Sequence, residues 1–250
     1  MTTITEYRQY GEDLEKLLKL RTSPIAVKML EKEEDIPEDA VRPKRDRGYH
    51  LAQCQAFAMS RREKDTIAML KEDNWCPGPL TAYGIMERPQ GQNSRERQSV
   101  PYSSFDYGKY IGIMTAPLIT TNFEPDVVII YSNTAQLRSI LLTIRNEERS
   151  LIESNFFPIS CASAVVSPIL TGKYWITLPD PGEYERALGG EDEMMFSVPR
   201  EKMEEFMTDF KKAQEGSWGY AHFNYIIRPD FPQPELYKTV FKQWGLDVKE

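Results

Sequence analysis

The chain has 250 residues, of which 40% are hydrophobic and 28% are charged, and its formal net charge is −7. This composition is typical of a soluble globular protein, and the length allows one large α/β domain or two small ones. The negative charge disfavours nonspecific binding to nucleic acid. Because no run of about 18 apolar residues and no secretory signal is visible, we expect no membrane association and a cytoplasmic location.

The first third of the chain alternates predicted helices with short predicted strands. Leucines at helical spacing predict a first helix, with Thr5 as its candidate cap. The charged segment 31–48 is expected to be a surface loop. Its basic run, Arg42–Arg47, is interpreted as solvated, with an anion-binding or nucleic-acid arm as the alternative. The elements predicted here are helices over 5–20, 49–62 and 80–86, a strand over 25–30, and a short strand or helical turn over 66–71.

The clearest strand is predicted over 125–131, where a continuous β-branched run indicates burial on both faces. A helix over 135–147 follows, and this strand–turn–helix unit is typical of an α/β sheet. Asn133 or Thr134 is the expected N-cap, and the same helix end is a candidate site for a small anion. The other elements predicted after residue 86 are a polar excursion over 87–108, strands over 111–115, 117–120, 173–178 and 194–198, a turn over 180–182, and helices from Cys161 to Pro168 or Gly172, over 199–212 and over 235–244.

These elements predict an α/β fold (mixed α+β), in which a mixed sheet is flanked by helices. We expect a single domain over residues 1–213. Residues 214–250 form a predicted C-terminal extension that is rich in aromatic residues and proline. We expect this extension to pack on the domain or on a second subunit.

The chain contains three cysteines, Cys54, Cys76 and Cys161. A free cysteine is often no more than a small buried hydrophobe, and no C-x₂-C pair is present. However, Cys76 precedes a Pro-Gly turn and a predicted helix, Cys161 lies near a helix start, and Cys54 lies on an alanine-lined helix. A helix N-terminus favours the thiolate, which is the form that binds metals. We therefore predict that the three sulfurs converge on one metal or iron–sulfur site.

The identity of the metal stays open at this point. Three thiolates on a [4Fe–4S] cluster would leave one iron open for a small molecule. A Cys₃His zinc site is the alternative, with His50, one turn from Cys54, as its candidate histidine and His222 as a weaker one. The acidic run Glu191–Glu193 is a further candidate for a divalent ion, although a solvated loop is the simpler interpretation.

Several dispersed motifs occur in an order that resembles a known family. They are Ser23–Lys28, Cys54–Arg61, Cys76–Gly78, Pro125–Asn133, Cys161-Ala162, Thr171–Lys173, Leu178–Gly182 and Asp192–Pro199. Together they span roughly residues 10–212 and resemble the domain of unknown function 169 family, found mostly in anaerobic bacteria and archaea. The resemblance implies that the cysteine positions of the family correspond to Cys54, Cys76 and Cys161. It implies an architecture and a site, but no reaction.

The leading functional hypothesis is a [4Fe–4S] protein of anaerobic metabolism, whose open iron performs redox or Lewis-acid chemistry on a small molecule. Three alternatives stay open: a non-catalytic accessory or binding subunit, a structural Cys₃His zinc protein, and a cluster-free enzyme that binds a small anion at Asn133-Thr134. The expected partners are a small-molecule ligand and, through the extension, a second copy or a larger assembly. Neither nucleic acid nor membrane is expected.

Overall fold

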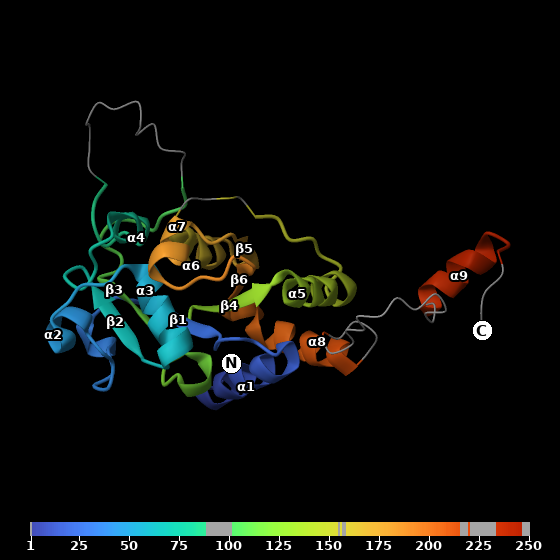
Figure 1. Cartoon of the computed structure of the whole chain (residues 1–250), viewed down its shortest axis with the longest axis horizontal. Helices are drawn as coiled ribbons and strands as arrows, with labels where there is room; N and C mark the ends of the chain where they lie inside the picture. Colours follow the sequence, from blue (N-terminus) through green and yellow to red (C-terminus); the bar gives the residue numbers. More distant parts are fainter. Residues whose placement is uncertain are drawn as a thin grey trace, which may run out of the picture.

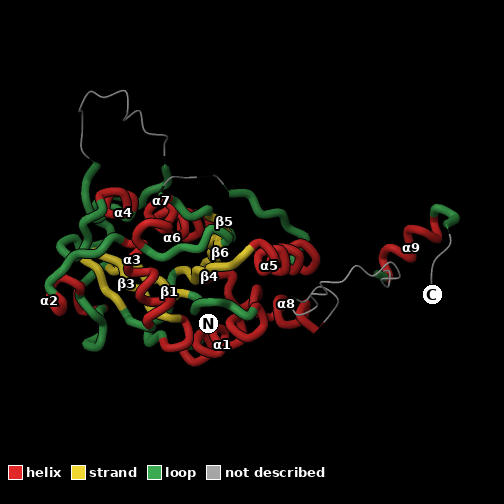
Figure 2. The backbone as a smooth tube through the Cα atoms, in the orientation of Figure 1, coloured by secondary structure: helices red, strands yellow, loops and turns green. Residues whose placement is uncertain are grey.

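The computed structural model describes residues 2–88, 102–154, 156, 159–215, 220 and 234–246. A six-stranded sheet in the order β2-β3-β1-β4-β6-β5 runs through the middle of the body (Figure 2). All of its strand pairings are antiparallel. The strands are β1 (Ile25–Leu30), β2 (Ile67–Leu70), β3 (Gly112–Pro117), β4 (Val127–Asn133), β5 (Trp175–Thr177) and β6 (Glu193–Pro199).

Helices cover both faces of this sheet (Figure 1). The α-helices in the described residues are α1 (Ile4–Leu18), α2 (Pro43–Arg47), α3 (Gln53–Ala58), α4 (Pro77–Ala82), α5 (Thr134–Glu147), α6 (Ser160–Thr171), α7 (Pro181–Arg186), α8 (Met203–Glu215) and α9 (Glu235–Gln243). Short 3₁₀ turns occur at η1 (Glu33–Asp35), η4 (Leu118–Thr120) and η5 (Arg200–Lys202), and α3 continues into a π-helical turn, η2 (Met59–Glu63).

The two faces of the sheet belong to two separate hydrophobic clusters. On β4, Val127, Ile129 and Tyr131 join the cluster that includes residues of α3 and α6. Val128 and Ile130 join the opposite cluster, with residues of α1, α5 and α8. Because alternate side chains of a strand point to opposite faces, a strand covered on both sides must be apolar at nearly every position. This explains the continuous hydrophobic run of β4.

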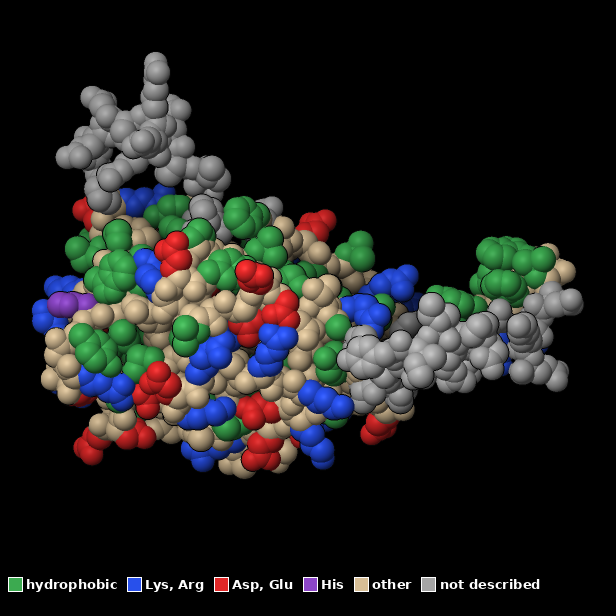
Figure 3. All heavy atoms as spheres, viewed as in Figure 1, with side chains coloured by type: hydrophobic (Ala, Val, Ile, Leu, Met, Phe, Trp, Pro, Cys, Tyr) green, Lys and Arg blue, Asp and Glu red, His purple; other side chains and the backbone are tan. Residues whose placement is uncertain are grey.

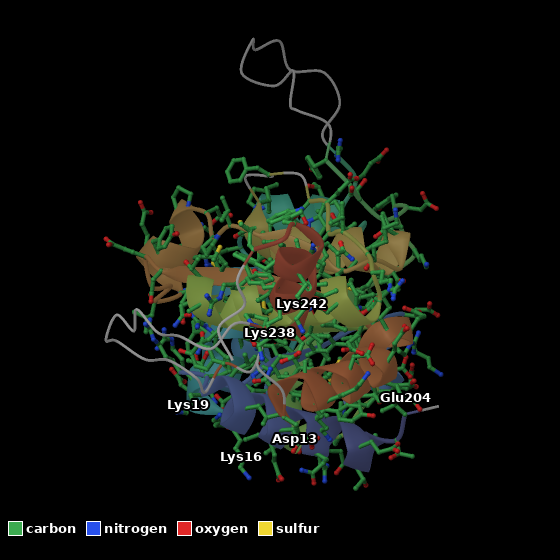
Figure 4. All side chains as sticks on the ribbon, turned by 90° about the vertical axis from the view of Figure 1, so that its right-hand side faces the viewer. Asp13, Lys16, Lys19, Glu204, Lys238 and Lys242 are labelled. Atoms are coloured by element: carbon green, nitrogen blue, oxygen red, sulfur yellow. The ribbon has the colours of Figure 1, made fainter. Side chains whose placement is uncertain are left out.

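Helices α1 and α8 lie side by side beneath the sheet (Figure 4). Asp13 of α1 forms an ion pair with Lys211 of α8, and 2.5 Å separates Oδ2 of Asp13 from Nζ of Lys211. Gly11 allows α1 to approach η4 closely, because a Cβ atom at this position would lie 2.8 Å from the backbone nitrogen of Ile119. This layer therefore depends on close helix packing.

The predicted α/β class is confirmed, and the sheet flanked by helices is present. The strand pairings are antiparallel throughout, where a mixed sheet was expected. β1 has the predicted bounds. Asn133 is the N-cap of α5, where its side chain accepts a hydrogen bond from the backbone N–H of Gln136 at 2.9 Å. The side chain of Asn133 therefore has a structural role at the helix end proposed as an anion site.

Several element boundaries differ from the sequence-based predictions. Thr3, and not Thr5, caps α1, because its side chain and that of Glu6 form a reciprocal capping box. The second helix begins at Gln53, since Leu51 is held in a bridge to Asn74. Helix α4 begins at Pro77, which suits the first helical position because proline lacks an N–H.

Two further predictions need correction in the C-terminal half. The segment predicted as a turn at 180–182 opens a helix, α7, in which Asp180 is the N-cap. The end predicted for α6 is correct in its second alternative: Pro168 lies inside the helix, and Gly172, which has a positive φ of 63°, is the C-cap. Pro199 ends β6 and does not begin a helix.

The charged segment 31–48 also contains structure that the sequence did not predict. Part of its basic run forms α2, and Arg42 is buried, with its guanidinium paired to Asp73 at 2.7 Å and to Glu72 at 2.5 Å. Arg42 therefore stabilises the fold and does not belong to an exposed arm. In the acidic run, Asp192 pairs with Arg21 at 2.5 Å.

None of the described helices combines the length and apolar character needed to cross a membrane. Most of the predicted extension lies outside the described residues. Its described helix α9 has no buried residue and lies apart from the body (Figure 1).

Candidate thiol site

Cys54 lies in the first turn of α3 and is 4% exposed. The helix begins here because Ala52 has extended backbone angles and its N–H donates to the Gln55 side chain at 2.9 Å. Ala56, one turn after Ala52, is fully buried, and its small side chain keeps the helix slim. α3 packs against α7, which brings Cys54 close to the residues of that helix.

Cys76 is the N-cap residue of α4 and is half-buried. Its backbone N–H donates to Oδ1 of Asn74 at 2.8 Å, which fixes the turn before the helix. Gly78 lets this turn approach the start of α6, because a Cβ atom there would lie 3.0 Å from Cδ1 of Ile159. Ile159 is the N-cap of α6, so Gly78 places the Cys76 turn beside the helix that carries Cys161.

Cys161 is the second residue of α6 and is 5% exposed. One carboxylate holds the start of its helix. Oδ2 of Asp180 accepts the N–H of Ser160 at 2.9 Å, and Oδ1 accepts those of Gly182 at 2.7 Å and Glu183 at 3.2 Å. Asp180 therefore ties the first turns of α6 and α7 together.

The structure brings the three cysteines into one region. Cys54 and Cys161 belong to the same buried cluster, and Cys76 packs against it. The Tyr83 hydroxyl donates to the carbonyl of Cys161 at 3.2 Å and lies within the same cluster. Segments that are remote in the sequence thus contribute Cys54, Cys76 and Cys161 to one hydrophobic cluster or its edge, and the meeting of the three sulfurs at one centre stays a prediction.

The protonation of these thiols differs from the prediction. Burial first, and then the charge of Glu183, raises the pKa of Cys54 to about 12. Burial first, and then the charge of Cys54, raises the pKa of Cys161 well above its ordinary value. The expected thiolate at the start of α6 is therefore disfavoured, because desolvation outweighs the helix dipole. A metal would have to displace these protons on binding.

The described residues contain no group of three or more His, Cys, Asp or Glu side chains that could hold a single metal ion. His50 is exposed and precedes α3, so it does not lie one helical turn from Cys54 on the same face. The other candidate histidine, His222, lies outside the described residues. In the acidic run, Glu193 is buried and forms an ion pair.

Glu183 is a residue of the site that the sequence reasoning missed. It is fully buried, and burial is the main reason that its pKa is raised to about 8. The Tyr131 hydroxyl donates to its Oε2 at 3.1 Å, whereas Oε1 has no hydrogen-bond partner among the described residues. Because a buried carboxyl oxygen without a partner is costly, Glu183 is a candidate functional residue.

Glu193 is a second buried carboxylate of this region. Glu193 pairs with Arg61 through two contacts of 3.1 Å, and the Arg61 guanidinium lies 3.9 Å from the ring centroid of Tyr131. Tyr131 therefore contacts both Arg61 and Glu183, which joins the two buried carboxylates in one polar network.

Arg186 adds a cation at the exposed end of this region. Its guanidinium lies 5.1 Å from the ring of Trp75, the residue before Cys76. It also lies over Gly182, where a Cβ atom would be 2.1 Å from one of its nitrogens. Hydrophobic side chains gather on the surface over α4 and α7 (Figure 3). The surface over α4 and α7 thus combines apolar side chains with the positive charge of Arg186.

The fold defines an α/β protein with an antiparallel six-stranded sheet, in which Cys54 and Cys161 lie in the hydrophobic cluster on one face and the half-buried Cys76 packs against it. Residues 13–209 match the model of the family DUF169, described as uncharacterised ArCR. The chain therefore belongs to this family, which confirms the resemblance noted from its motifs. Comparisons with curated proteins and with solved structures found no match.

Proposed function

We propose that this protein is an iron–sulfur protein in which Cys54, Cys76 and Cys161 hold a [4Fe–4S] cluster and leave one iron open to a small molecule. The observation that supports the proposal is that Cys54 and Cys161, from α3 and α6, belong to one buried hydrophobic cluster, against which Cys76 packs. The chain has no other cysteine. All three are free thiols, which suits a cytoplasmic protein in a reducing compartment.

A [4Fe–4S] cluster and a single zinc ion need different spacings between their sulfur ligands. Each cysteine of a [4Fe–4S] cluster binds a different iron, so the sulfurs lie further apart than the ligands of one ion. Within the described part of the chain, no ligand group for a single ion is present. His50, the histidine expected for a Cys₃His site next to Cys54, is exposed.

Such a cluster supplies an electron carrier or a Lewis acid for a small molecule of anaerobic metabolism. The protein's own residues exclude water from this region, because Cys54, Cys161 and Glu183 are almost completely buried. The half-buried Cys76 is the most accessible of the three thiols, and it directly follows the exposed Trp75. We infer that a small molecule enters there.

The test is purification of the full chain without oxygen, followed by reconstitution and assays of iron, sulfide and visible absorbance. We expect about four irons and about four sulfides per chain. The single changes Cys54→Ser, Cys76→Ser and Cys161→Ser should each reduce both values, and Ser167→Ala on α6 should not. A colourless protein without iron after reconstitution would contradict the proposal.

A non-catalytic accessory subunit is the second candidate, and α9 favours it. This helix buries none of its residues, while Leu236 and Trp244 are each 68% exposed. If this is the function, replacing all three cysteines by serine should leave both the fold and the binding of a co-purified partner unchanged. Loss of that partner from the triple variant would count against it.

A further inference from the structure

A cavity of about 690 Å³ lies at the end of α6 opposite to Cys161. Its lining comes from the segment after α5, from the residues that join α6 to β5, and from η5 and the start of α8. Cys161 and Thr171, which lines the cavity, are about 15 Å apart along the axis of α6. The cavity is therefore separate from the thiol site, and its volume suits a small molecule.

Part of the cavity wall is held by a buried carboxylate. The side chain of Glu148 is 7% exposed, accepts a hydrogen bond from the Tyr174 hydroxyl at 2.5 Å and pairs with Lys202 at 3.1 Å. The Lys202 ammonium also lies 4.8 Å from the ring centroid of Tyr174. Because these three side chains satisfy one another, they form a fixed wall and do not need a ligand.

Two further hydrogen bonds hold the apolar part of the lining. The indole N–H of Trp175 donates to Oγ of Ser163 at 3.1 Å, which fixes the orientation of the ring. Oγ of Ser154 accepts the N–H of Ile176 at 2.8 Å and so ties the segment after α5 to the outer edge of β5. This segment carries Leu151, which lines the cavity and is 84% exposed. Trp175 and Leu151 thus offer apolar surface that a ligand could cover.

Two charged side chains of the lining are left without a partner. Neither Lys173 nor Glu153 forms an ion pair or a side-chain hydrogen bond with any other described residue. The two charges are opposite and border the same cavity, yet they do not pair with each other. A ligand with one anionic and one cationic group would form a charge-assisted hydrogen bond with each of them. An α-amino acid carries both groups on one carbon atom, next to its side chain.

We propose that this cavity binds an α-amino acid with a large apolar side chain. Lys173 pairs with the carboxylate of the ligand, Glu153 pairs with its ammonium group, and Trp175 and Leu151 contact its side chain. A large side chain is favoured because it removes more apolar surface from water on these two residues than a small one does. This is a second site of the protein, and the inference does not rest on the iron–sulfur proposal.

The experiment measures the binding of L-leucine, L-phenylalanine and glycine to the full-length protein by calorimetry. We expect at least one of the two large amino acids to bind, and glycine, which keeps both charges but has no side chain, to bind more weakly. Two analogues of the tighter ligand then separate the charges: one lacks the ammonium group and the other lacks the carboxylate. Each analogue should bind about tenfold more weakly than the amino acid, because it loses a charge-assisted hydrogen bond.

Two variants test which residues make these contacts. Lys173→Gln and Glu153→Gln should each weaken binding of the amino acid about tenfold. Lys173→Gln should have little effect on the analogue without a carboxylate, and Glu153→Gln should have little effect on the analogue without an ammonium group, because the matching contact is already absent. Both residues are exposed, so both variants are expected to fold, which circular dichroism checks.

Two exposed charges outside the cavity provide matched controls. Lys16→Gln on α1 and Glu185→Gln on α7 remove charges of the same two signs and should bind the amino acid as the wild type does. Failure of both large amino acids to bind the wild type, or unchanged affinity in Lys173→Gln and Glu153→Gln, would overturn the inference. Equal affinity for the amino acid and for its analogue without an ammonium group would show a simple anion site and would also reject it. Iron and sulfide assays of the same preparations decide the thiol-site proposal separately.

Discussion

Arg61 is the largest side chain that the structure buries completely, and its partner Glu193 is 4% exposed. Burial alone would raise the pKa of Glu193, but hydrogen bonds from Arg61 and from the backbone N–H of Gly190 outweigh it. The pKa of Glu193 is therefore lowered below its ordinary value of 4.5. A buried charge that is paired in this way is costly to leave without its partner.

We predict that Glu193→Gln lowers the free energy of unfolding by about 3–5 kcal/mol at neutral pH, because it leaves the Arg61 guanidinium buried without a counter-charge. Urea unfolding measures the change. Asp192→Asn is the matched control: it removes the neighbouring carboxylate, whose pair with Arg21 is exposed, and should cost less than about 1 kcal/mol. Equal losses in the two variants would contradict this role for Glu193.

The same pair predicts a dependence of stability on pH. A carboxyl group whose pKa is lower in the folded state stabilises the protein above its unfolded pKa, and this contribution is lost as the pH falls through the folded pKa. The wild type should therefore lose stability on acidification below about pH 4.5. The Glu193→Gln variant should lose less stability over this pH range than the wild type. Measuring the free energy of unfolding of both proteins from neutral to acidic pH checks this.

At the scale of single elements, Asp180 connects two helices that carry site residues. Its carboxylate accepts backbone N–H groups at the start of both α6 and α7. We predict that Asp180→Ala lowers the free energy of unfolding by about 1–3 kcal/mol and lowers the iron bound per chain, because Cys161 and Glu183 lose their shared anchor.

Asn133→Ala is the control for this prediction, since Asn133 caps α5 alone. It should cost about 1 kcal/mol, as expected for loss of a helix cap, without a loss of iron. If both variants bind as much iron as the wild type, Asp180 does not position the site. The same Asn133 variant also tests the anion site considered at the start of α5, because binding of a small anion there should disappear if that hypothesis holds.

Close packing of α1 leads to a second prediction at this scale. Alanine favours a helix over glycine by about 1 kcal/mol, but a Cβ atom at Gly11 would meet the backbone of η4. We predict that Gly11→Ala destabilises the protein by about 1–3 kcal/mol, as overpacking does. Thermal unfolding measures it, with the exposed Lys16→Ala on the same helix (Figure 4) as a control that should change little. A more stable Gly11→Ala variant would disprove the contact.

At the scale of the whole molecule, the two layers of helices enclose the sheet without the help of α9. None of the residues of α9 is buried, and both Leu236 in the helix and Trp244 at its C-cap are exposed. We predict that deletion of residues 234–250 leaves the melting temperature unchanged within about 2 °C, because little apolar surface leaves the core. Calorimetry of both chains checks this, and a large fall in melting temperature would show that the end of the extension packs on the body.

Local patterns in the sequence predicted many of the helices and strands. β1, β4 and α5 are encoded by apolar periodicity and by the Asn133 cap, which act over a few residues. The short helices at the site were harder to predict. α7 begins within an Asp-Pro-Gly sequence that is equally typical of a turn, and its helix is stabilised by Asp180, the N-cap, which accepts the N–H groups of Gly182 and Glu183.

The sequence by itself determined the class of fold, the family and the three thiols that could form a site, because these depend on residue type and local order. Only the tertiary structure decided the antiparallel strand order, the burial of Glu183 and the pairing of Arg61 with Glu193, 132 residues away. The physical reason is that burial and partner choice arise from contacts between remote segments. Periodicity and capping act within a single helix or strand and carry no information about such contacts.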